Sequence, residues 1–499
     1  MNITELQQSY ASHPNVEGVC RLLKDNSVRH LYCGGLYASA ASLFSSVLVQ
    51  RATCPLVFIL GDMEEAGYFY HDLTQILGTE QVLFFPSSFR RAIKYGQKDA
   101  ANEILRTEVL SRLQKGEEGL CVVTYSDALA EKVVSRKELG ENTLKLHAGE
   151  RVDMNFVTDV LRSYGFEYVD YVYEPGQYAV RGSIIDVFSF SSEYPFRIDF
   201  FGDEVESVRT FEVETQLSKE KKESIVIVPD LSHSLEKKGS GGMVSFLDFL
   251  PSDSLLAMRD FLWLRERIQT VHDESLTPQA IAARESEENG AITLEGKLID
   301  GGEFTLRALD FRRMEFGNKP TGTPDATVSF HTTVQPIFHK NFDMVAESFR
   351  EYLSRHYTIY ICSDSLKQTD RIRAIFEDRG DNISFTAVER TLHEGFADDT
   401  LRICIFTDHQ LFDRFHKYNL KSDKARSGKV ALSLKELNQF TPGDYVVHTD
   451  HGVGRFAGLV RIPNGDTTQE VMKIVYQNED VVFVSIHSLH KVSKYKGKE

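Results

Sequence analysis

The segment from residue 176 to residue 211 constrains the fold of this chain most strongly, because its pattern is that of paired β-strands. In the run FRIDFF (196–201), Phe196, Ile198 and Phe200 alternate with Arg197, Asp199 and Phe201, as expected for a strand with one buried face. Gly202-Asp203 follows this run and is a dipeptide typical of two-residue hairpins. The segment is therefore predicted to form a small sheet with tight turns.

Arg181, Arg197 and Asp199 are charged residues within this otherwise apolar segment. A guanidinium group binds carboxylates with a fixed forked geometry, so these residues suit a protein-docking surface. Ordinary solvated charges on an exposed sheet face produce the same pattern. The residues alone leave both interpretations open.

The length and composition indicate a multidomain protein without a membrane span. A chain of 499 residues predicts three or four domains, and 41% hydrophobic residues are enough for several cores. The net charge of −16 argues against the whole chain wrapping nucleic acid, so any such contact needs a local basic patch. No apolar run approaches the roughly 18 residues of a membrane helix.

The cysteines and the first residues favour a cytoplasmic protein. The six cysteines form no Cys-x-x-Cys pair, and three of them lie in apolar strand-like runs, as expected of buried, reduced thiols. The first ten residues, MNITELQQSY, contain no apolar core of a signal peptide. We expect cytoplasmic localisation.

Residues 1–147 alternate between strand and helix patterns, which predicts a mostly parallel sheet. After the first strand, Gly35, Ala40, Ala41 and Ser42 stand in the register of the phosphate-binding motif GxxxxGK[ST]. The second glycine and the lysine of that motif are replaced by alanines, so no cation is present to hold β- and γ-phosphates. We predict a degenerate loop that binds no nucleotide, whether or not it ever did.

Three further regions precede the C-terminus. Residues 216–328 are predicted to resume the first α/β domain after the insertion of 148–215, and residues 329–420 to form a second α/β domain of unknown function. Residues 421–439 are basic and poor in apolar residues. This linker is interpreted as a solvated tether, with contact to DNA phosphates as the alternative.

Residues 440–499 show short strands at regular spacing, which predicts a small SH3- or Tudor-like barrel. The glycine-rich run His451-Gly-Val-Gly-Arg455 is expected to be a turn. The pairs His448/His451 and His487/His490 lack neighbouring cysteines or acids at ligand spacing, so no metal site is predicted. No catalytic Ser-His-Asp or Cys-His signature is present, and no catalytic residue is assigned.

The string Tyr178-Ala-Val-Arg-Gly-Ser-Ile-Ile-Asp-Val-Phe, followed by Phe196-Arg-Ile-Asp-Phe-Phe-Gly-Asp-Glu, resembles the UvrA-binding domain shared by UvrB and the bacterial transcription-repair coupling factors (Mfd). The resemblance implies that residues of this domain contact UvrA. By position these are Arg181, Arg197, Asp199, Phe188 and Phe201. Ala179 departs from UvrB, which has an arginine there, and fits the coupling factors better.

A second string, Pro442-Gly-Asp-Tyr-Val-Val-His-Thr-Asp-His-Gly-Val-Gly-Arg-Phe-Ala-Gly458, is similar to the RNA polymerase-interacting domain of the coupling factors and to CarD-type regulators. In that family the strand after this string pairs with the polymerase β subunit, a mode in which main-chain bonds give affinity. The resemblance places Leu459, Val460, Arg461 and Ile462 on this strand.

Together the two resemblances imply the N-terminal half of a coupling factor. The implied domains are 1–147 (degenerate P-loop domain 1a), 148–215 (UvrA-binding domain 2), 216–328 (domain 1b), 329–420 (domain 3), the linker 421–439, and 440–499 (polymerase-interacting domain).

The implied function is that of a non-catalytic, monomeric adaptor between RNA polymerase and UvrA. ATP, Mg²⁺ and most DNA contact are expected only for a motor beyond this chain. The alternatives are an ATP-dependent UvrB-like repair subunit and a CarD-like transcription regulator. The first is disfavoured by Ala40 and Ala41, and the second leaves the segment 176–211 unexplained.

Overall fold

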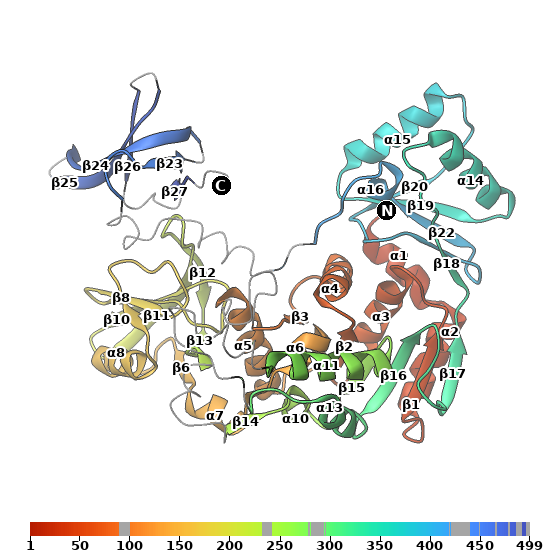
Figure 1. The fold of residues 1–499 in the computed structure, drawn as a ribbon, viewed down its shortest axis with the longest axis horizontal. Coiled ribbons are helices and arrows are strands. Elements are labelled where there is room, and N and C mark those ends of the chain that lie inside the picture. The colour runs from red at the N-terminus through yellow and green to blue at the C-terminus, as the bar shows by residue number, and fades with distance from the viewer. Residues whose placement is uncertain are drawn as a thin grey trace. The chain divides into compact units, whose positions relative to one another are not determined.

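The fold was analysed in a computed structural model (Figure 1). It describes residues 1–88, 100–231, 242–277, 280, 294, 296–418, 420, 440–448, 450–464, 467–477, 480–485 and 492–495. The chain divides into two units, Met1–Leu139 with Leu235–Leu420, and Gly140–Ser234 with Lys421–Glu499. The predicted linker 421–439 and the pair His487/His490 lie outside the described residues.

The first unit is built on a seven-stranded sheet in the order β17-β1-β16-β15-β2-β4-β3 (Figure 1). All of its strand pairs are parallel, as the strand-helix alternation predicted. The central strands β2 and β4 are buried along their whole length, because helices cover both faces of such a sheet. The strands are β1 (His30–Gly34), β2 (Leu56–Leu60), β3 (Val82–Phe85), β4 (Cys121–Tyr125), β15 (Leu255–Met258), β16 (Arg312–Gly317) and β17 (Ala326–Ser329).

Some of the helices around this sheet begin at residues whose side chains cap them. Asp62 accepts a hydrogen bond from the amide of Glu65 at the start of α4, and Asp260 does the same for Trp263 at the start of α11. The helices of this part are α1 (Ile3–Ala11), α2 (Pro14–Lys24), α3 (Ala40–Arg51), α4 (Met63–Leu77), α5 (Ala100–Lys115), α6 (Ser126–Ala130), α7 (Arg136–Glu141), α10 (Phe246–Phe249), α11 (Phe261–Ser275) and α13 (Gly301–Ala308). A small antiparallel pair joins β5 (Val133–Val134) and β14 (Met243–Val244).

The first unit also contains a second, five-stranded sheet in the order β18-β21-β22-β19-β20. Its strands are β18 (Thr332–Val334), β19 (Thr358–Ser363), β20 (Thr386–Glu389), β21 (Phe396–Asp398) and β22 (Ile403–Thr407), with helices α14 (Phe342–Ser354), α15 (Leu366–Asp378) and α16 (Asp408–Leu411). The prediction of a second α/β fold is confirmed.

The N-terminal helices connect the two sheets of this unit. The amino group of Met1 donates to the carbonyl of Ala387 on β20 at 3.1 Å. Tyr10 on α1 donates its hydroxyl to the buried carboxylate of Asp398 on β21 at 3.0 Å. Burial alone would raise the pKa of Asp398, but hydrogen bonds from His13, Leu401 and Tyr10 hold it below its usual value. The charged carboxylate of Asp398 therefore finds hydrogen-bond partners where the N-terminal helices meet the second sheet.

The second unit contains a six-stranded sheet in the order β12-β11-β10-β9-β8-β7. Its strands are β7 (Glu167–Tyr168), β8 (Gln177–Arg181), β9 (Ile184–Val187), β10 (Phe196–Phe201), β11 (Glu204–Phe211) and β12 (Ser218–Lys222), and α8 (Met154–Ser163) covers one face. A separate antiparallel pair joins β6 (Leu144–His147) and β13 (Ser224–Ile227). The domain boundary predicted at residue 215 falls before β12 and β13. β12 could not be predicted as a strand, because its charged run has no apolar alternation.

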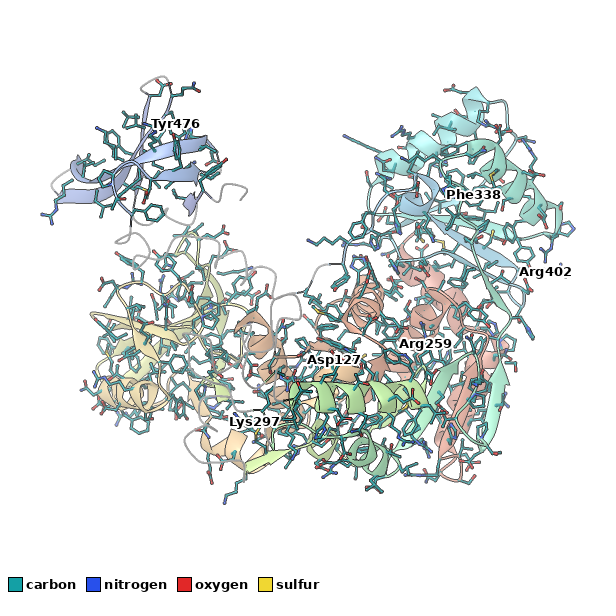
Figure 2. The ribbon with its side chains drawn as sticks, in the orientation of Figure 1. Asp127, Arg259, Lys297, Phe338, Arg402 and Tyr476 are labelled. Carbon is teal, nitrogen blue, oxygen red and sulfur yellow. The ribbon has the colours of Figure 1, made fainter. Side chains whose placement is uncertain are left out.

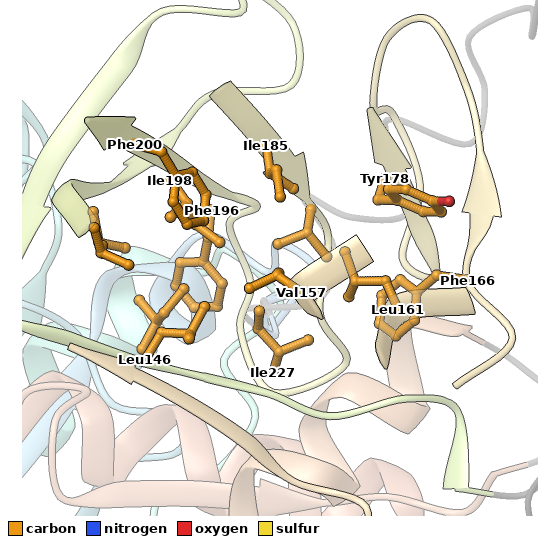
Figure 3. Close-up of a cluster of buried hydrophobic side chains, with 14 residues drawn as sticks. Leu146, Val157, Leu161, Phe166, Tyr178, Ile185, Phe196, Ile198, Phe200 and Ile227 are labelled. Carbon is orange, nitrogen blue, oxygen red and sulfur yellow. The ribbon is translucent and has the colours of Figure 1, made fainter. Parts of the chain in front are cut away.

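The core of this sheet lies between the strands and α8. Figure 3 shows Ile185, Ile198 and Phe196 of the strands facing Val157 and Leu161 of the helix. The predicted hairpin at Gly202-Asp203 is confirmed, since Phe201 pairs with Glu204 and Gly202 has φ +64°.

The C-terminal strands form one curled antiparallel sheet in the order β26-β25-β24-β23-β27. They are β23 (Tyr445–His448), β24 (Gly452–Asn464), β25 (Thr467–Val475), β26 (Val481–Ser485) and β27 (Val492–Lys494). The predicted β structure is confirmed, but within the described strands β26 and β27 are unpaired with each other, so the sheet is a half-barrel rather than a closed barrel. The predicted glycine-rich turn was wrong beyond Gly452, because Val453 and Arg455 already pair with β23.

Across the described residues, no helix has the length and apolar character that crossing a membrane requires.

Candidate functional site

The two faces of the small sheet differ sharply in character. Alternate residues of each strand point to opposite faces of the sheet. One set, which includes the paired residues Val187 and Phe196, packs in the core with α8. The other set places Arg181, Arg197 and Asp199 together on the opposite face, as the alternation predicted. We call this second surface the polar face.

A buried carboxylate organises the polar face. Asp186 on β9 lies opposite Arg197 on β10, and its side chain is 0% exposed. Arg197 donates from Nε to Oδ1 at 2.7 Å and from Nη2 to Oδ2 at 2.9 Å, the bidentate geometry of a strong charge-assisted pair. Arg181 donates to Oδ2 of the same carboxylate. One buried acid therefore fixes the two predicted arginines.

The two arginines differ in how much of each side chain is exposed to a binding partner. Arg197 also donates to the carbonyl of Gln216 at 3.0 Å and lies over the ring of Phe211, so its side chain is only 17% exposed. Arg181 lies over the ring of Tyr171 with a side chain that is 36% exposed. Arg181 is therefore the better placed of the two to contact another protein.

Asp199 and Phe201 complete the polar face. Asp199 accepts a hydrogen bond from the hydroxyl of Ser183 at 3.0 Å. Phe201, at the hairpin end of β10, is 78% exposed, a large apolar side chain next to a charged cluster. Aromatic anchors of this kind are enriched in protein interfaces.

Phe188 does not belong to this surface. It follows β9 and is only 1% exposed, so its side chain packs inside the protein. The sequence prediction of Phe188 as a contact residue is contradicted by this burial. The missed residue is Asp186, whose place opposite Arg197 on the same face could have been found from the strand register.

The strand predicted to bind polymerase has one open edge. Leu459, Val460, Arg461 and Ile462 lie in β24 and pair with residues 469–472 of β25. On its other side, β24 pairs with β23 only through residues 452–455, with Phe456 bonded to residues 443 and 444. Within the described residues, the segment 457–464 therefore has an unpaired edge. Leu459 and Arg461 are exposed, whereas Val460 and Ile462 are half-buried.

The turn after β1 is filled by the protein's own groups. Gly35 has φ +79°, and a Cβ there would lie 1.9 Å from the carbonyl oxygen of Phe330, so packing alone requires this glycine. Ala40 and Ala41 begin α3 and are 0% and 2% exposed. The hydroxyl of Ser42 donates to the carboxylate of Asp72 on α4 at 2.6 Å.

Asp72 accepts three hydrogen bonds at this turn. Besides Ser42, the hydroxyl of Ser39 donates to it at 2.7 Å and the backbone amide of His393 at 2.7 Å. Burial raises the pKa of Asp72 to about 6, against the lowering effect of these donors. The serine hydroxyl, which ligates Mg²⁺ in an intact motif, thus donates a hydrogen bond to an internal carboxylate.

The cavity beside this turn repels polyanions. Its volume is about 570 Å³. Arg259, labelled in Figure 2, lines it but pairs with Glu65. The acidic residues that line it are Asp62, Glu64, Glu65, Asp72 and Glu394. Carboxylates at this density oppose a nucleotide polyphosphate.

Two family models match the two regions of the chain that contain these surfaces. The model of the UvrB interaction domain matches residues 144–233, and the model of the CarD-like/TRCF RID domain matches residues 440–496. Curated relatives extend the similarity over most of the chain. A transcription-repair-coupling factor of Staphylococcus aureus (strain bovine RF122 / ET3-1) is 23% identical over 530 residues, and one of Bacillus subtilis (strain 168) is 22% identical over 543 residues.

The chain is homologous to the transcription-repair-coupling factors. The similarity covers 93% of the chain but only 45% of each of these two relatives, so the chain spans less than half of their length. Within this coupling-factor homologue, the polar face falls inside the match to the UvrB interaction domain, and the open edge of β24 inside the match to the RID domain.

Removing the Asp186 carboxylate tests the organisation of the polar face. We expect Asp186→Ala to lower the free energy of unfolding by about 3 kcal/mol, because two guanidinium groups lose a buried partner. Urea unfolding followed by circular dichroism measures the change. Asp199→Ala, on the same face and bonded to Ser183, is the control and should cost less than about 1 kcal/mol. Equal effects of the two variants would contradict the assigned role of Asp186.

The turn after β1 predicts that this chain does not bind ATP. With no lysine in the loop and Asp72 already bonded to Ser42, calorimetry with Mg²⁺-ATP up to about 1 mM should show no binding heat. Saturable binding that Ser42→Ala abolishes would contradict this prediction.

Proposed function

We propose that this chain is the non-catalytic adaptor part of a transcription-repair coupling factor. It binds UvrA through the polar face and the β subunit of RNA polymerase through the open edge of β24. The observation that carries the proposal is that the polar face and the open edge of β24 lie within the two family matches on one chain.

The polar face supports UvrA docking because its charges are already held in position. Asp186 fixes the guanidinium groups of Arg181 and Arg197, so binding loses little side-chain freedom. Asp199 offers an acceptor and Phe201 an exposed aromatic anchor next to them. Such a surface fits a partner with both acidic groups and an apolar pocket.

The open edge of β24 supports polymerase docking by strand addition. The unpaired main-chain groups of 457–464 can bond to a strand of the partner, and Leu459 and Arg461 can select it through their exposed side chains. The match of this module to the CarD-like/TRCF RID domain also supports this choice of partner.

The site after β1 supports an adaptor without nucleotide chemistry of its own. Asp72 replaces an external ligand of Ser42, and acidic side chains surround the neighbouring cavity. An ATP-dependent UvrB-like role therefore finds no support in this loop. In this proposal, ATP hydrolysis and most DNA contact belong to the part of the coupling factors that this chain does not match.

Phe201 gives the sharpest test of UvrA docking, because its exposure lets the variant keep the fold. We expect Phe201→Ala to weaken binding to purified UvrA at least about tenfold, since an interface anchor is lost, without a change in melting temperature. Phe156→Ala is the matched control, because Phe156 is 54% exposed on α8, on the far side of the core. Loss of binding in both variants, or in neither, would contradict the assignment of the polar face.

Leu459 tests the polymerase surface in the same way. Leu459→Glu places a charge beside the open edge and should weaken binding to the isolated polymerase β subunit at least about tenfold. Val481→Glu changes a residue of similar exposure on the edge strand β26 and should leave the affinity unchanged. The opposite ranking would move the docking edge from β24 to β26.

A further inference from the structure

Four histidines that are distant in sequence meet within the first unit. His71 lies on α4, His393 follows β20, His409 lies on α16 and His416 follows that helix. One ring nitrogen from each of His393, His409 and His416 lies within 4.8 Å of the others. The ring centroid of His71 is 4.9 Å from that of His416. No spacing in the sequence indicates this group.

The closest pair of nitrogens has the separation of two ligands on one ion. Nδ1 of His393 is 3.3 Å from Nδ1 of His416. On a tetrahedral ion with metal–nitrogen bonds of about 2.0–2.1 Å, two nitrogen ligands lie about 3.3 Å apart. Without an ion, this distance requires one ring to donate a hydrogen bond to the other.

His409 is held in the tautomer that leaves one nitrogen free for an ion. Its Nε2 lies 2.7 Å from the carbonyl oxygen of His393, which can only accept, so Nε2 carries the hydrogen. The lone pair on Nδ1 is then available, as in metal sites whose second ring nitrogen is bonded to a carbonyl. The rings of His409 and His416 are stacked with centroids 4.2 Å apart, so His416 must turn about its Cβ–Cγ bond for all three to face one ion.

An acid lies beside the cluster. The carboxylate of Asp408 is 3.8 Å from Nδ1 of His409 and also pairs with Arg414 at 3.0 Å.

We propose that His393, His409 and His416 bind one divalent transition-metal ion of the zinc class, with His71 as the next available imidazole. Imidazole nitrogens suit zinc, cobalt and nickel. With His71 as a further ligand, the ion would fasten the second α/β fold to α4. The site shares no residue with the polar face or with β24.

The test measures Co²⁺ and Zn²⁺ binding to the full chain, purified without a histidine tag. We expect one Co²⁺ per chain with the strong visible absorption of a four-coordinate ion, displaced by Zn²⁺, and a higher melting temperature with either metal. His416→Ala should weaken Co²⁺ binding at least about tenfold. The control His451→Ala removes one member of the pair His448/His451 in the C-terminal sheet and should change nothing.

Three results would overturn the proposal. They are no binding by the wild-type chain at 100-fold excess metal, binding with the weak absorption of a six-coordinate ion, and equal affinity in the wild type and His416→Ala. Circular dichroism of metal-free His416→Ala checks that it folds. If it does not, the absorption of the wild-type chain and the His451→Ala control still decide the outcome.

Discussion

The charge pair between Asp186 and its two arginines is the interaction on which the candidate UvrA surface depends. A buried carboxylate between two guanidinium groups contributes little net stability, because removing the charges from water costs about as much as the pairing returns. Its contribution is to hold the side chains of the two arginines in position. Arg197 is fixed by two hydrogen bonds to Asp186 and by Phe211, which leaves Arg181, Asp199 and Phe201 as the outward-facing part of the surface.

A second buried acid has a comparable role in the first unit. Asp72 accepts hydrogen bonds from Ser39 and Ser42 at the turn after β1 and from the amide of His393 in the second α/β fold. The hydroxyl that would ligate Mg²⁺ in an intact phosphate-binding loop is thus bonded within the protein. These hydrogen bonds connect α3, α4 and the loop after β20.

The sequence predicted much of this architecture, and the remaining features depend on tertiary contacts. Alternation in FRIDFF predicted both β10 and the face that carries Arg197 and Asp199, because strand periodicity is a local property. Burial of Phe188 and the partnership of Asp186 depend on strand pairing and on packing after β9, which no single strand encodes. The charged strand β12 lacks an apolar pattern, since pairing with β11 rather than its own side chains places it in the sheet. The histidine cluster joins residues more than 300 positions apart.

The central claim is that one chain holds UvrA and RNA polymerase at the same time. Mass photometry of the chain with purified UvrA and purified polymerase measures this directly. We predict a species with the summed mass of all three components, which forms only when the chain is present. If the two partners compete for the chain, so that only binary complexes appear, the two-surface adaptor is contradicted.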